Sequence, residues 1–433
     1  MGPRVSIHTL GCKVNQYDGA MLSQALEQEG FRLVAPQDEA DAVVVNTCTV
    51  TSATDRQNRQ LIRRLRRANP RALMVITGCQ AEVFPEALEG MPEVDLVLGN
   101  RQKGDIPRAI LEALHPEDIL GRRTFVNSPL WQGGVRCPPG HTRAFLKVQE
   151  GCDAQCTYCI VPRARGPSRS RPPDSVMEEL KCMEEAGVKE VVITGVHLGK
   201  YGKDLNPPWS LAKLLWEILE RCALPRIRLS SIEPLELGED LLHCMVTHPR
   251  ICPHLHVPLQ SGDDEVLRWM NRPYRTAEYL EKAELARSMV PDLTWGCDVM
   301  VGFPGETPAQ FQRTVEFLGR LPLTYLHVFP FSPRPGTVAW TLPHRVPPQE
   351  VKARAQALRE ISRRRRAEAM ASYVGRGLTV LAERPWKGSW GWIEGLSPNY
   401  LRVRFRGGME LHNEIVAVRV VGVQGTHLLA ERL

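Results

Sequence analysis

Three cysteines stand close together about a third of the way along the chain, directly after the strand-like segment Ala144–Glu150. Cys152, Cys156 and Cys159 form a CxxxCxxC run. Cysteines this close cannot span opposite walls of a fold, so we expect their thiols to converge on one point in a loop. Three thiolates are one ligand short of a closed tetrahedral zinc site or a four-cysteine iron–sulfur site. A 4Fe–4S cluster held by three thiolates would leave one iron open to bind another molecule.

The position of this run resembles the signature of radical S-adenosylmethionine (SAM) enzymes, in which CxxxCxxC follows the first strand. The resemblance implies that the open iron binds the amino and carboxylate groups of SAM, and that the reduced cluster splits SAM to a 5′-deoxyadenosyl radical. The alternative is a structural zinc ion with a distant fourth ligand such as His141 or Cys182. Zinc is disfavoured because structural zinc sites usually have paired short Cys or His spacings.

The composition limits the class of protein. A length of 433 residues predicts roughly three domains, and twelve cysteines are far below the density of a disulfide scaffold. With no apolar signal segment and no apolar run that could span a bilayer, we expect a cytoplasmic protein without a membrane partner. In that compartment clustered cysteines serve as metal or redox ligands. The net charge of +6 is mild, so contacts with nucleic acid must come from local patches.

The pattern of apolar runs predicts an α/β protein with three domains. Residues 1–115 predict an open parallel α/β sheet, and residues 116–142, rich in Pro, Gly and Arg, predict a linker. Residues 143–372 contain six strand–helix units, the number typical of the partial (β/α)6 barrel of radical SAM enzymes. Residues 373–433 predict a small all-β barrel. The strands expected there are Leu378–Ala382, Leu401–Phe405 and Ile415–Val423, and the first helix of the chain is expected at Tyr17–Glu29.

A second set of cysteines is spread over the first domain. Cys12, Cys48 and Cys79 each end a strand-like run, and their separations are 48 − 12 = 36 and 79 − 48 = 31 residues. These separations match one strand–helix unit of about thirty residues. Ligands of open parallel sheets lie outside the carboxyl ends of the strands, so the three thiols could meet at one edge. A buried structural cysteine is the alternative for any single one.

The motif Thr9-Leu-Gly-Cys-Lys-Val-Asn-Gln-Tyr-Asp18, the CxxxCxxC run and the β-rich tail together resemble the radical SAM methylthiotransferase family. That family has an N-terminal methylthiotransferase domain, a central radical SAM domain and a C-terminal TRAM domain. The resemblance implies that Cys12, Cys48 and Cys79 hold a second 4Fe–4S cluster, whose open iron carries the sulfur to be transferred. It also implies two SAM molecules per turnover and an electron donor such as flavodoxin or ferredoxin, while the sulfur donor stays unknown.

Several motifs at predicted strand ends are candidates for SAM contacts. Any one glycine-containing turn could be an ordinary loop, but together at the carboxyl ends of barrel strands they indicate an active-site rim. A glycine there lets backbone carbonyls approach the ammonium group of SAM, although the Gly-Gly-Glu common in the superfamily is missing. The resemblance places Tyr158 near the adenine, and the Asp298–Gly302 segment on the adenine side. The candidate residues are Tyr158, Thr194, Gly195, Val196, Ser231, Glu233, Gln260, Asp298 and Gly302.

Two arginine-rich stretches are candidates for binding the phosphates of RNA. Arg163, Arg165, Arg169 and Arg171 follow the last cysteine of the run, although a solvated loop would explain them too. In the tail, Arg402, Arg404 and Arg406 alternate with apolar residues on a predicted strand. Period-two spacing puts them on one face over an apolar interior, as on small barrels that bind RNA. In the resembled family this domain helps to grip tRNA.

Within the family, the chain most resembles the branch that acts on threonylcarbamoyladenosine beside the tRNA anticodon. Gly11-Cys-Lys-Val-Asn-Gln16, Thr194-Gly-Val-His-Leu-Gly199 and Leu229-Ser-Ser-Ile-Glu-Pro234 carry this resemblance. The expected product has a methylthio group on carbon 2 of the base. The alternatives are the branch that acts on isopentenyladenosine and a non-catalytic iron–sulfur protein that binds RNA. The latter is disfavoured because a pure binder needs no open-iron clusters beside a SAM-like pocket.

Overall fold

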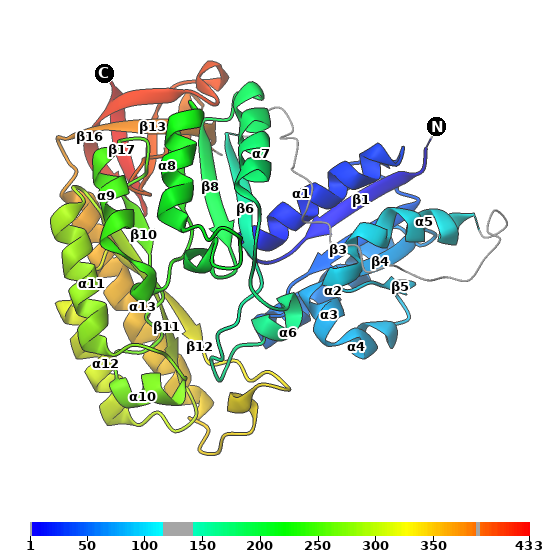
Figure 1. Cartoon of the computed structure of the whole chain (residues 1–433), viewed down its shortest axis with the longest axis horizontal. Coiled ribbons are helices and arrows are strands. Elements are labelled where there is room, and N and C mark those ends of the chain that lie inside the picture. The colour runs from blue at the N-terminus through cyan, green and yellow to red at the C-terminus, as the bar shows by residue number, and fades with distance from the viewer. Residues whose placement is uncertain (1, 116–141, 387–389) are drawn as a thin grey trace. The chain divides into compact units, whose positions relative to one another are not determined.

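The computed structural model describes residues 2–115, 142–386 and 390–433 (Figure 1). The linker expected at 116–142, with Cys137 and His141, lies outside the described residues except for its last position. By its internal contacts the described chain forms two compact units. The first contains residues 2–115, 149–179 and 332–340, and the second contains residues 142–148, 180–331, 341–386 and 390–433.

A parallel five-stranded sheet forms the centre of the first unit. Its strand order is β2-β1-β3-β4-β5. The central strand is buried at all six positions, because helices cover both faces of a sheet of this kind. The strands are β1 (Arg4–Thr9), β2 (Arg32–Leu33), β3 (Ala42–Thr47), β4 (Leu73–Gly78) and β5 (Leu96–Val97). The helices are α1 (Lys13–Gln28), α2 (Ser52–Ala68), α3 (Cys79–Val83), α4 (Pro85–Glu89), the 3-10 turn η1 (Asn100–Asp105) and α5 (Ile106–Leu114).

Two separate apolar cores lie on the two faces of this sheet. Val44 of β3 packs with residues of α1 and α5, whereas its neighbours Val43 and Val45 pack with residues of α2, α3 and α4. Successive side chains of a strand point to opposite faces, so one apolar strand serves both cores. In β3 and β4 the polar residues Asn46, Thr47 and Thr77 accordingly lie at the carboxyl ends.

Six strands of the central region run in the spatial order β6, β8, β9, β10, β11 and β12. The sheets β7-β6-β8-β9 and β10-β11-β12 are joined by parallel bridges from Ile227 to Ile251 and from Ser231 to His256. Each strand is followed by at least one helix, which confirms the six strand–helix units expected from the sequence. The strands are β6 (Arg143–Glu150), β7 (Arg169–Ser170), β8 (Glu190–Gly195), β9 (Arg226–Leu229), β10 (His254–His256), β11 (Thr294–Val301) and β12 (Tyr325–Pro330). The helices are α6 (Val161–Arg165), α7 (Pro173–Glu185), α8 (Leu211–Arg221), α9 (Glu239–Thr247), α10 (Asp264–Trp269), α11 (Thr276–Met289), α12 (Pro308–Arg320) and α13 (Pro348–Ala371), with 3-10 turns η4 (Leu198–Lys200), η5 (Pro234–Glu236) and η6 (Val338–Trp340).

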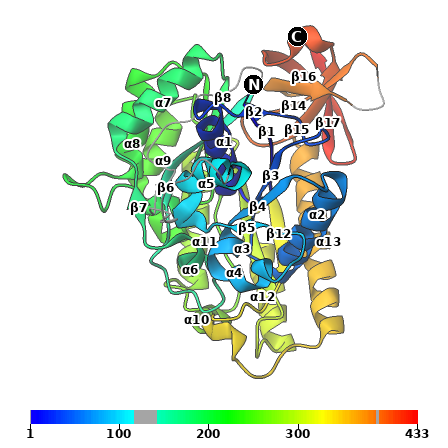
Figure 2. The ribbon, with the colours of Figure 1, turned by 90° about the vertical axis from the view of Figure 1, so that its right-hand side faces the viewer.

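The C-terminal residues close into a barrel of strand order β13-β14-β15-β17-β16, drawn in orange and red in Figure 2. Val403 and Phe405 of β15 lie in its apolar core. The sequence predicted three of its strands and missed β14 and β17, because the buried Glu394 interrupts the apolar pattern of β14. The strands are β13 (Gly377–Pro385), β14 (Trp392–Leu396), β15 (Arg402–Arg406), β16 (Ile415–Gln424) and β17 (His427–Arg432), with the turn η7 (Met409–Leu411).

Two buried arginines of β9 connect the (β/α) strands to this small barrel. Arg228 binds the carboxylate of Glu190 in a bidentate way, at 2.7 and 3.0 Å. It also donates to the carbonyl oxygens of Pro398 and Ser397, at 2.7 and 3.2 Å, and Arg226 donates to that of Leu396 at 2.9 Å. Burial by itself raises the pKa of Glu190, but Arg228 outweighs this and holds the pKa below its usual value. The pair is therefore ionised, and it fixes the C-terminal barrel to β9.

No helix in the described part of the chain is both long and apolar enough to cross a membrane. The longest helix, α13, has 24 residues and carries several arginines along its length. Its charges rule it out as a membrane span.

We expect Arg228→Ala to lower the free energy of unfolding by about 3–5 kcal/mol, because it leaves a buried carboxylate without its main partner. A matched control is Arg221→Ala, which removes an exposed pair with Glu217 within one helix turn. That change should cost only about 0.3–0.5 kcal/mol. Urea unfolding followed by circular dichroism measures both. Equal losses for the two variants would contradict the role assigned to Arg228.

Candidate functional site

The cysteines of the first domain lie at the carboxyl ends of adjacent strands. Cys48 and Cys79 directly follow β3 and β4, and Cys12 caps the start of α1 just after β1. Since β1, β3 and β4 are neighbours in the sheet, their carboxyl ends share one edge. Burial raises the pKa of the Cys48 thiol to about 12, and the nearby Cys79 and Cys12 thiols add to this. The structure thus brings the three thiols together.

A glycine in the left-handed region precedes three of the six candidate cysteines. Gly11, Gly78 and Gly151 have φ values of +103°, +97° and +73°. A Cβ on Gly11 would come within 2.6 Å of the Cβ of Cys48, and one on Gly151 within 1.9 Å of the carbonyl oxygen of Pro167. Only glycine fits such a turn without strain. The Gly-Cys pairs were thus a signal in the sequence that could have marked these turns.

The first helix begins four residues earlier than expected, at Lys13 instead of Tyr17. The polar but buried Asn15 interrupts the apolar pattern by which the sequence marks the helix. Its amide donates to the carbonyl oxygens of Asn46 and Thr47, at 3.3 and 3.2 Å. Asn15 therefore ties the first turn of α1 to the end of β3, beside Cys12 and Cys48.

The CxxxCxxC run lies in a loop of the first unit whose two ends are joined. The amide of Cys152 donates to Gly166 at 3.0 Å, and β7 pairs with the last two residues of β6. The thiols of Cys152, Cys156 and Cys159 are all half-buried, as is the side chain of Tyr158. The loop therefore presents its thiols from a fixed backbone.

The helix that follows this loop packs against the second set of cysteines. Ile160 and Ala164 form a small apolar cluster with Cys79 and Val83. The amide of Asn100 donates to the carbonyl oxygen of Ala164 at 2.6 Å. Both cysteine sets thus belong to one compact unit, and α6 lies next to the Cys79 helix.

Arg165 of α6 is buried at the centre of this unit. Its Nε lies 3.3 Å from Cys79 Sγ, and its Nη1 lies 2.7 Å from Asp18 and 3.2 Å from Glu150. Its Nη2 donates to the side-chain oxygen of Asn15 at 3.0 Å. Burial alone lowers the pKa of Arg165, but the surrounding anionic groups outweigh it and raise the pKa above its usual value. The guanidinium is therefore charged.

Arg171 is equally buried and binds a different set of partners. It pairs with Glu179 and donates to the hydroxyl oxygen of Tyr17 at 2.9 Å. These positions keep Arg165 and Arg171 away from solvent, so neither can reach an RNA phosphate as expected from the sequence. Arg163 is exposed and Arg169 is half-buried, and for these two phosphate contact stays a prediction.

Residues 332–340 complete the first unit, which was not expected from the sequence. Arg334 pairs with Asp55 at 2.7 Å and also contacts the hydroxyl group of Thr49, next to Cys48. Further along, the amide of Ala339 donates to the carbonyl oxygen of Thr157 in the CxxxCxxC loop, at 2.8 Å. The segment therefore contacts the surroundings of both cysteine sets.

The candidate SAM residues other than Tyr158 lie in the second unit, in or after successive parallel strands. Thr194 and Gly195 end β8, Ser231 and Glu233 follow β9, Gln260 follows β10, and Asp298 and Gly302 lie in and after β11, while Val196 directly follows β8. Glu233 pairs with the buried Arg272, and burial raises the pKa of Glu233. Gln260 has a φ of +69°, unusual for a residue with a side chain, and its amide donates to the carbonyl oxygen of Asp298 at 2.8 Å. Such strain is common at functional sites.

Asp298 is the centre of a polar network along β10, β11 and β12. It accepts hydrogen bonds from His256 Nε2 at 2.9 Å and His327 Nδ1 at 3.3 Å. Tyr325 links His256 to His254, at 3.2 and 2.8 Å. Burial raises the pKa of Asp298, but the bonds from the two histidines outweigh it and hold the pKa well below its usual value.

The donor chemistry tests which metal group the cysteines could hold. Each set offers three cysteine thiols, one ligand short of a closed four-thiolate zinc site, and this number fits a 4Fe–4S cluster with one open iron. Among the described residues, His256, Asp298 and His327 form a group of three ligand side chains whose donor atoms all lie within 4.8 Å.

The arginines of β15 alternate with core residues, but they differ in exposure. The side chain of Arg402 is 50% exposed and that of Arg404 only 15%, and both bind the buried carboxylate of Glu394. Arg404 lies over the ring of Trp386 at 4.2 Å, and Arg406 over that of Trp392 at 5.7 Å. The strand thus offers an aromatic and cationic surface that is held by one carboxylate.

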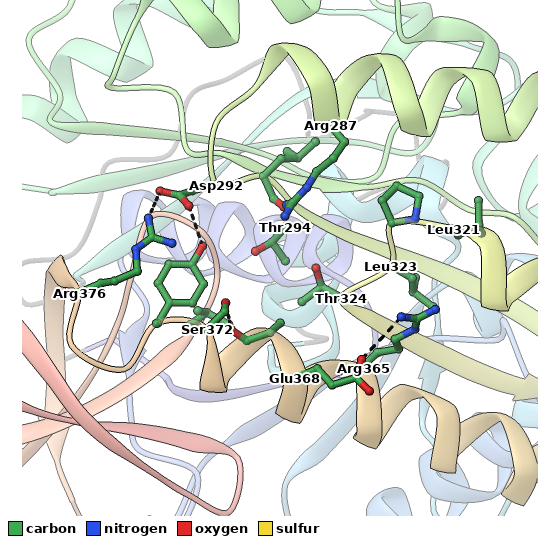
Figure 3. Close-up of a pocket in the computed structure, with 15 residues that line it drawn as sticks. Arg287, Asp292, Thr294, Leu321, Leu323, Thr324, Arg365, Glu368, Ser372 and Arg376 are labelled. Atoms are coloured by element: carbon green, nitrogen blue, oxygen red, sulfur yellow. Dashed lines mark hydrogen bonds and ion pairs between the residues drawn. The ribbon is translucent and has the colours of Figure 1, made fainter.

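A pocket of about 290 Å³ opens elsewhere in the second unit, between α11, α13 and the start of β13 (Figure 3). Its polar wall includes Asp292, which binds Arg376 at 2.6 Å and Tyr373 at 3.4 Å. None of the candidate site residues lines it. We therefore assign this pocket no part in the candidate site.

We expect Asp298→Asn to destabilise the protein in a pH-dependent way. A carboxyl group whose pKa is depressed on folding contributes stability that is present above its unfolded pKa of about 3.9 and is lost as the pH falls further. The difference in unfolding free energy between the native protein and Asp298→Asn should therefore shrink below about pH 4. Urea midpoints over a pH series measure it. A difference that does not change with pH would contradict the ionised network.

Comparisons with known proteins agree with this geometry. Residues 4–99 match the Uncharacterized protein family UPF0004, and residues 146–318 match the Radical SAM superfamily. The radical SAM methyltransferase TsrM of Kitasatospora setae, solved with cobalamin and a [4Fe-4S] cluster, shares the fold with a TM-score of 0.59 and 19% identity, over 78% of this chain and 74% of that one.

Relatives that match over most of the chain identify the family more closely. Threonylcarbamoyladenosine tRNA methylthiotransferase MtaB of Aquifex aeolicus is 39% identical over 87% of this chain and 92% of its own length. MtaB of Thermotoga maritima is 36% identical over 97% and 95%. A tRNA-2-methylthio-N(6)-dimethylallyladenosine synthase of Aquifex aeolicus is 30% identical over 97% and 96%. The protein therefore belongs to the radical SAM methylthiotransferase family.

Proposed function

We propose that this protein adds a methylthio group to carbon 2 of N(6)-threonylcarbamoyladenosine beside the anticodon of tRNA, by radical SAM chemistry. The observation that carries the proposal is the pairing of two cysteine sets in one compact unit, on a chain 39% identical to an MtaB enzyme. The synthase of the dimethylallyl branch is less similar, at 30%. We therefore favour threonylcarbamoyladenosine over isopentenyladenosine as the substrate.

As a radical SAM enzyme, the protein binds an iron–sulfur cluster and SAM. In our proposal Cys152, Cys156 and Cys159 hold one 4Fe–4S cluster, and Cys12, Cys48 and Cys79 hold a second. When bound, the clusters supply one-electron cleavage of SAM and a site for the sulfur that is transferred. The chain itself contributes the fixed thiols, the glycine turns that present them, and a buried arginine, Arg165, whose Nε–H reaches the thiol of Cys79.

Radical chemistry suits the proposed reaction because carbon 2 of adenine bears an unactivated C–H bond, which acid–base chemistry does not readily replace. Two SAM molecules per turnover would serve as methyl donor and radical source. Tyr158, Thr194, Gly195, Val196, Ser231, Glu233, Gln260, Asp298 and Gly302 are the proposed SAM contacts. Their support is the row of successive strand ends, which is where barrel enzymes hold their ligands.

The proposed partners follow from this reaction. The anticodon loop of tRNA would contact the cationic surface of β15, and the cytoplasm is where such a substrate is found. A low-potential protein such as flavodoxin or ferredoxin would supply electrons. The sulfur donor is not identified by any feature of the chain.

Cysteine variants test the two proposed clusters separately. Replacing Cys152, Cys156 and Cys159 with Ala should abolish SAM cleavage and about halve the iron, from ~8 atoms per chain, because an open-iron cluster needs all three thiolates. Replacing Cys12, Cys48 and Cys79 with Ala should leave part of the SAM cleavage but stop methylthio transfer. The measurements are iron content, 5′-deoxyadenosine and tRNA nucleosides by mass spectrometry.

Two results would refute the cluster assignments. One is 5′-deoxyadenosine production by the first triple variant after anaerobic reconstitution. The other is normal methylthio-adenosine formation by the second. Replacing Cys244, which is buried outside both sets, is the control and should change neither product.

Arginine variants test the surface that would bind tRNA. Replacing Arg402, Arg404 and Arg406 with Ala should weaken tRNA binding and flatten its salt dependence, by a slope of about 0.7–0.9 in log K against log salt for each phosphate group that the variant no longer binds. SAM cleavage without tRNA should not change. A matched pair, Arg406→Ala and Arg419→Ala, removes one exposed arginine from β15 or from β16. Only Arg406→Ala should reduce the slope of log K against log salt. Equal slopes for the two variants would indicate that β15 is an ordinary solvated face.

A further inference from the structure

One buried cation contacts a thiol of the second cysteine set directly. The side chain of Arg165 is only 4% exposed, and its Nε lies 3.3 Å from Cys79 Sγ. A buried charge is costly unless each of its donors finds a partner. The other guanidinium nitrogens find theirs in Asp18, Glu150 and Asn15. The contact with sulfur is thus one bond of a fully engaged, fixed group.

The carboxylates beside Arg165 are matched by an equal number of cations. Lys103, also only 4% exposed, binds Asp18 at 2.8 Å. Two cations, Arg165 and Lys103, therefore balance two carboxylates, Asp18 and Glu150. The Nε–H aimed at Cys79 is not required for this balance, since a lysine at 165 could supply the same charge. What only arginine supplies is a planar fork that binds carboxylate, amide and sulfur at once.

We propose that Arg165 is a positioning residue for the second cluster: it donates a hydrogen bond to the Cys79 thiolate and thereby raises the reduction potential of that cluster. The inference rests on the proposed function, in which Cys12, Cys48 and Cys79 hold an iron–sulfur cluster. Hydrogen bonds to the sulfurs are among the factors that set the potential of such clusters. Reduction adds negative charge, so a donor and a positive charge beside the sulfur stabilise the reduced form more than the oxidised form.

The same residue ties together the two cysteine sets within the first unit. Arg165 ends α6, the short helix that begins two residues after Cys159, and it reaches Asn15 and Asp18 on the helix that begins after Cys12. A change at Arg165 could therefore disturb the CxxxCxxC loop as well as Cys79. The test must observe the second cluster alone.

The experiment uses the full-length chain in which Cys152, Cys156 and Cys159 are replaced with Ala, so that any iron–sulfur signal comes from the second cluster. Arg165→Lys and Arg165→Gln are made in this background, reconstituted anaerobically, and compared by iron content and by potentiometry followed with electron paramagnetic resonance. We expect both variants to shift the potential to more negative values. The shift should be larger for Arg165→Gln, because Arg165→Lys keeps the positive charge and gives up only the guanidinium fork that reaches sulfur, carboxylate and amide together.

Arg171 provides the matched control. It lies in the same segment, its side chain is 1% exposed, and its bonds go to Glu179, Tyr17 and Ser175. Arg171→Lys and Arg171→Gln should load iron to the same level as the Arg165 variants and leave the potential of the second cluster unchanged. Equal shifts at both positions would mean that any loosening of the unit moves the potential, which would overturn the inference.

The remaining outcomes are also decisive. An unchanged potential in iron-loaded Arg165→Lys and Arg165→Gln would overturn the role of Arg165 and leave the cluster assignment intact. Failure of the triple-cysteine background itself to hold any iron would overturn that assignment, and this inference with it. If Arg165→Gln does not fold, Arg165→Lys alone decides, since a potential equal to that of the parent would contradict the hydrogen bond to sulfur.

Discussion

The first two turns of α1 are the part of the structure on which both cysteine sets depend. These turns begin directly after Cys12, and their buried side chains bind two arginines of the segment after the CxxxCxxC run. Arg165 binds Asn15 and Asp18, and Arg171 binds Tyr17. Removing one partner from a buried ion pair costs several kcal/mol, so these contacts hold the segment firmly against the sheet. The position of one cysteine set is thereby fixed by the same residues that anchor the other.

In the second unit, too, a buried arginine connects two parts of the fold. Arg228 spans the carboxylate of Glu190 and two carbonyl oxygens of the C-terminal barrel. Tyr400, in a left-handed turn before β15, stacks on His254 with ring centroids 4.3 Å apart. From His254 the polar network continues through Tyr325 to His256 and Asp298. The small barrel is thus held to the (β/α) strands by buried polar contacts, which fix its orientation more narrowly than apolar packing would.

Most of the architecture could be predicted from the sequence, whereas most of the ion pairs could not. Apolar runs at regular intervals specify parallel strands and helices, so the sheet, the six strand–helix units and the terminal barrel were all expected. The start of α1 and strand β14 were missed because Asn15 and Glu394 are polar residues in buried places. The α1 partners of Arg165 and Arg171 lie about 150 residues away in sequence, and no local pattern encodes a pairing over that distance. The contribution of residues 332–340 to the first unit could not be predicted for the same reason.

The arginines of this protein fall into two groups according to how deeply their side chains are buried. Arg165, Arg171 and Arg228 have side chains at most 4% exposed, and each is matched to carboxylates, so their charge is neutralised inside the fold. On β15 three arginines alternate with core residues, and a single buried carboxylate, Glu394, holds two of them. Glu394 also pairs with Arg384, so one carboxylate here faces several guanidinium groups beside Trp386 and Trp392. Aromatic rings beside several guanidinium groups suit single-stranded nucleic acid, whereas Arg165 and Arg171, near the cysteines, serve the interior.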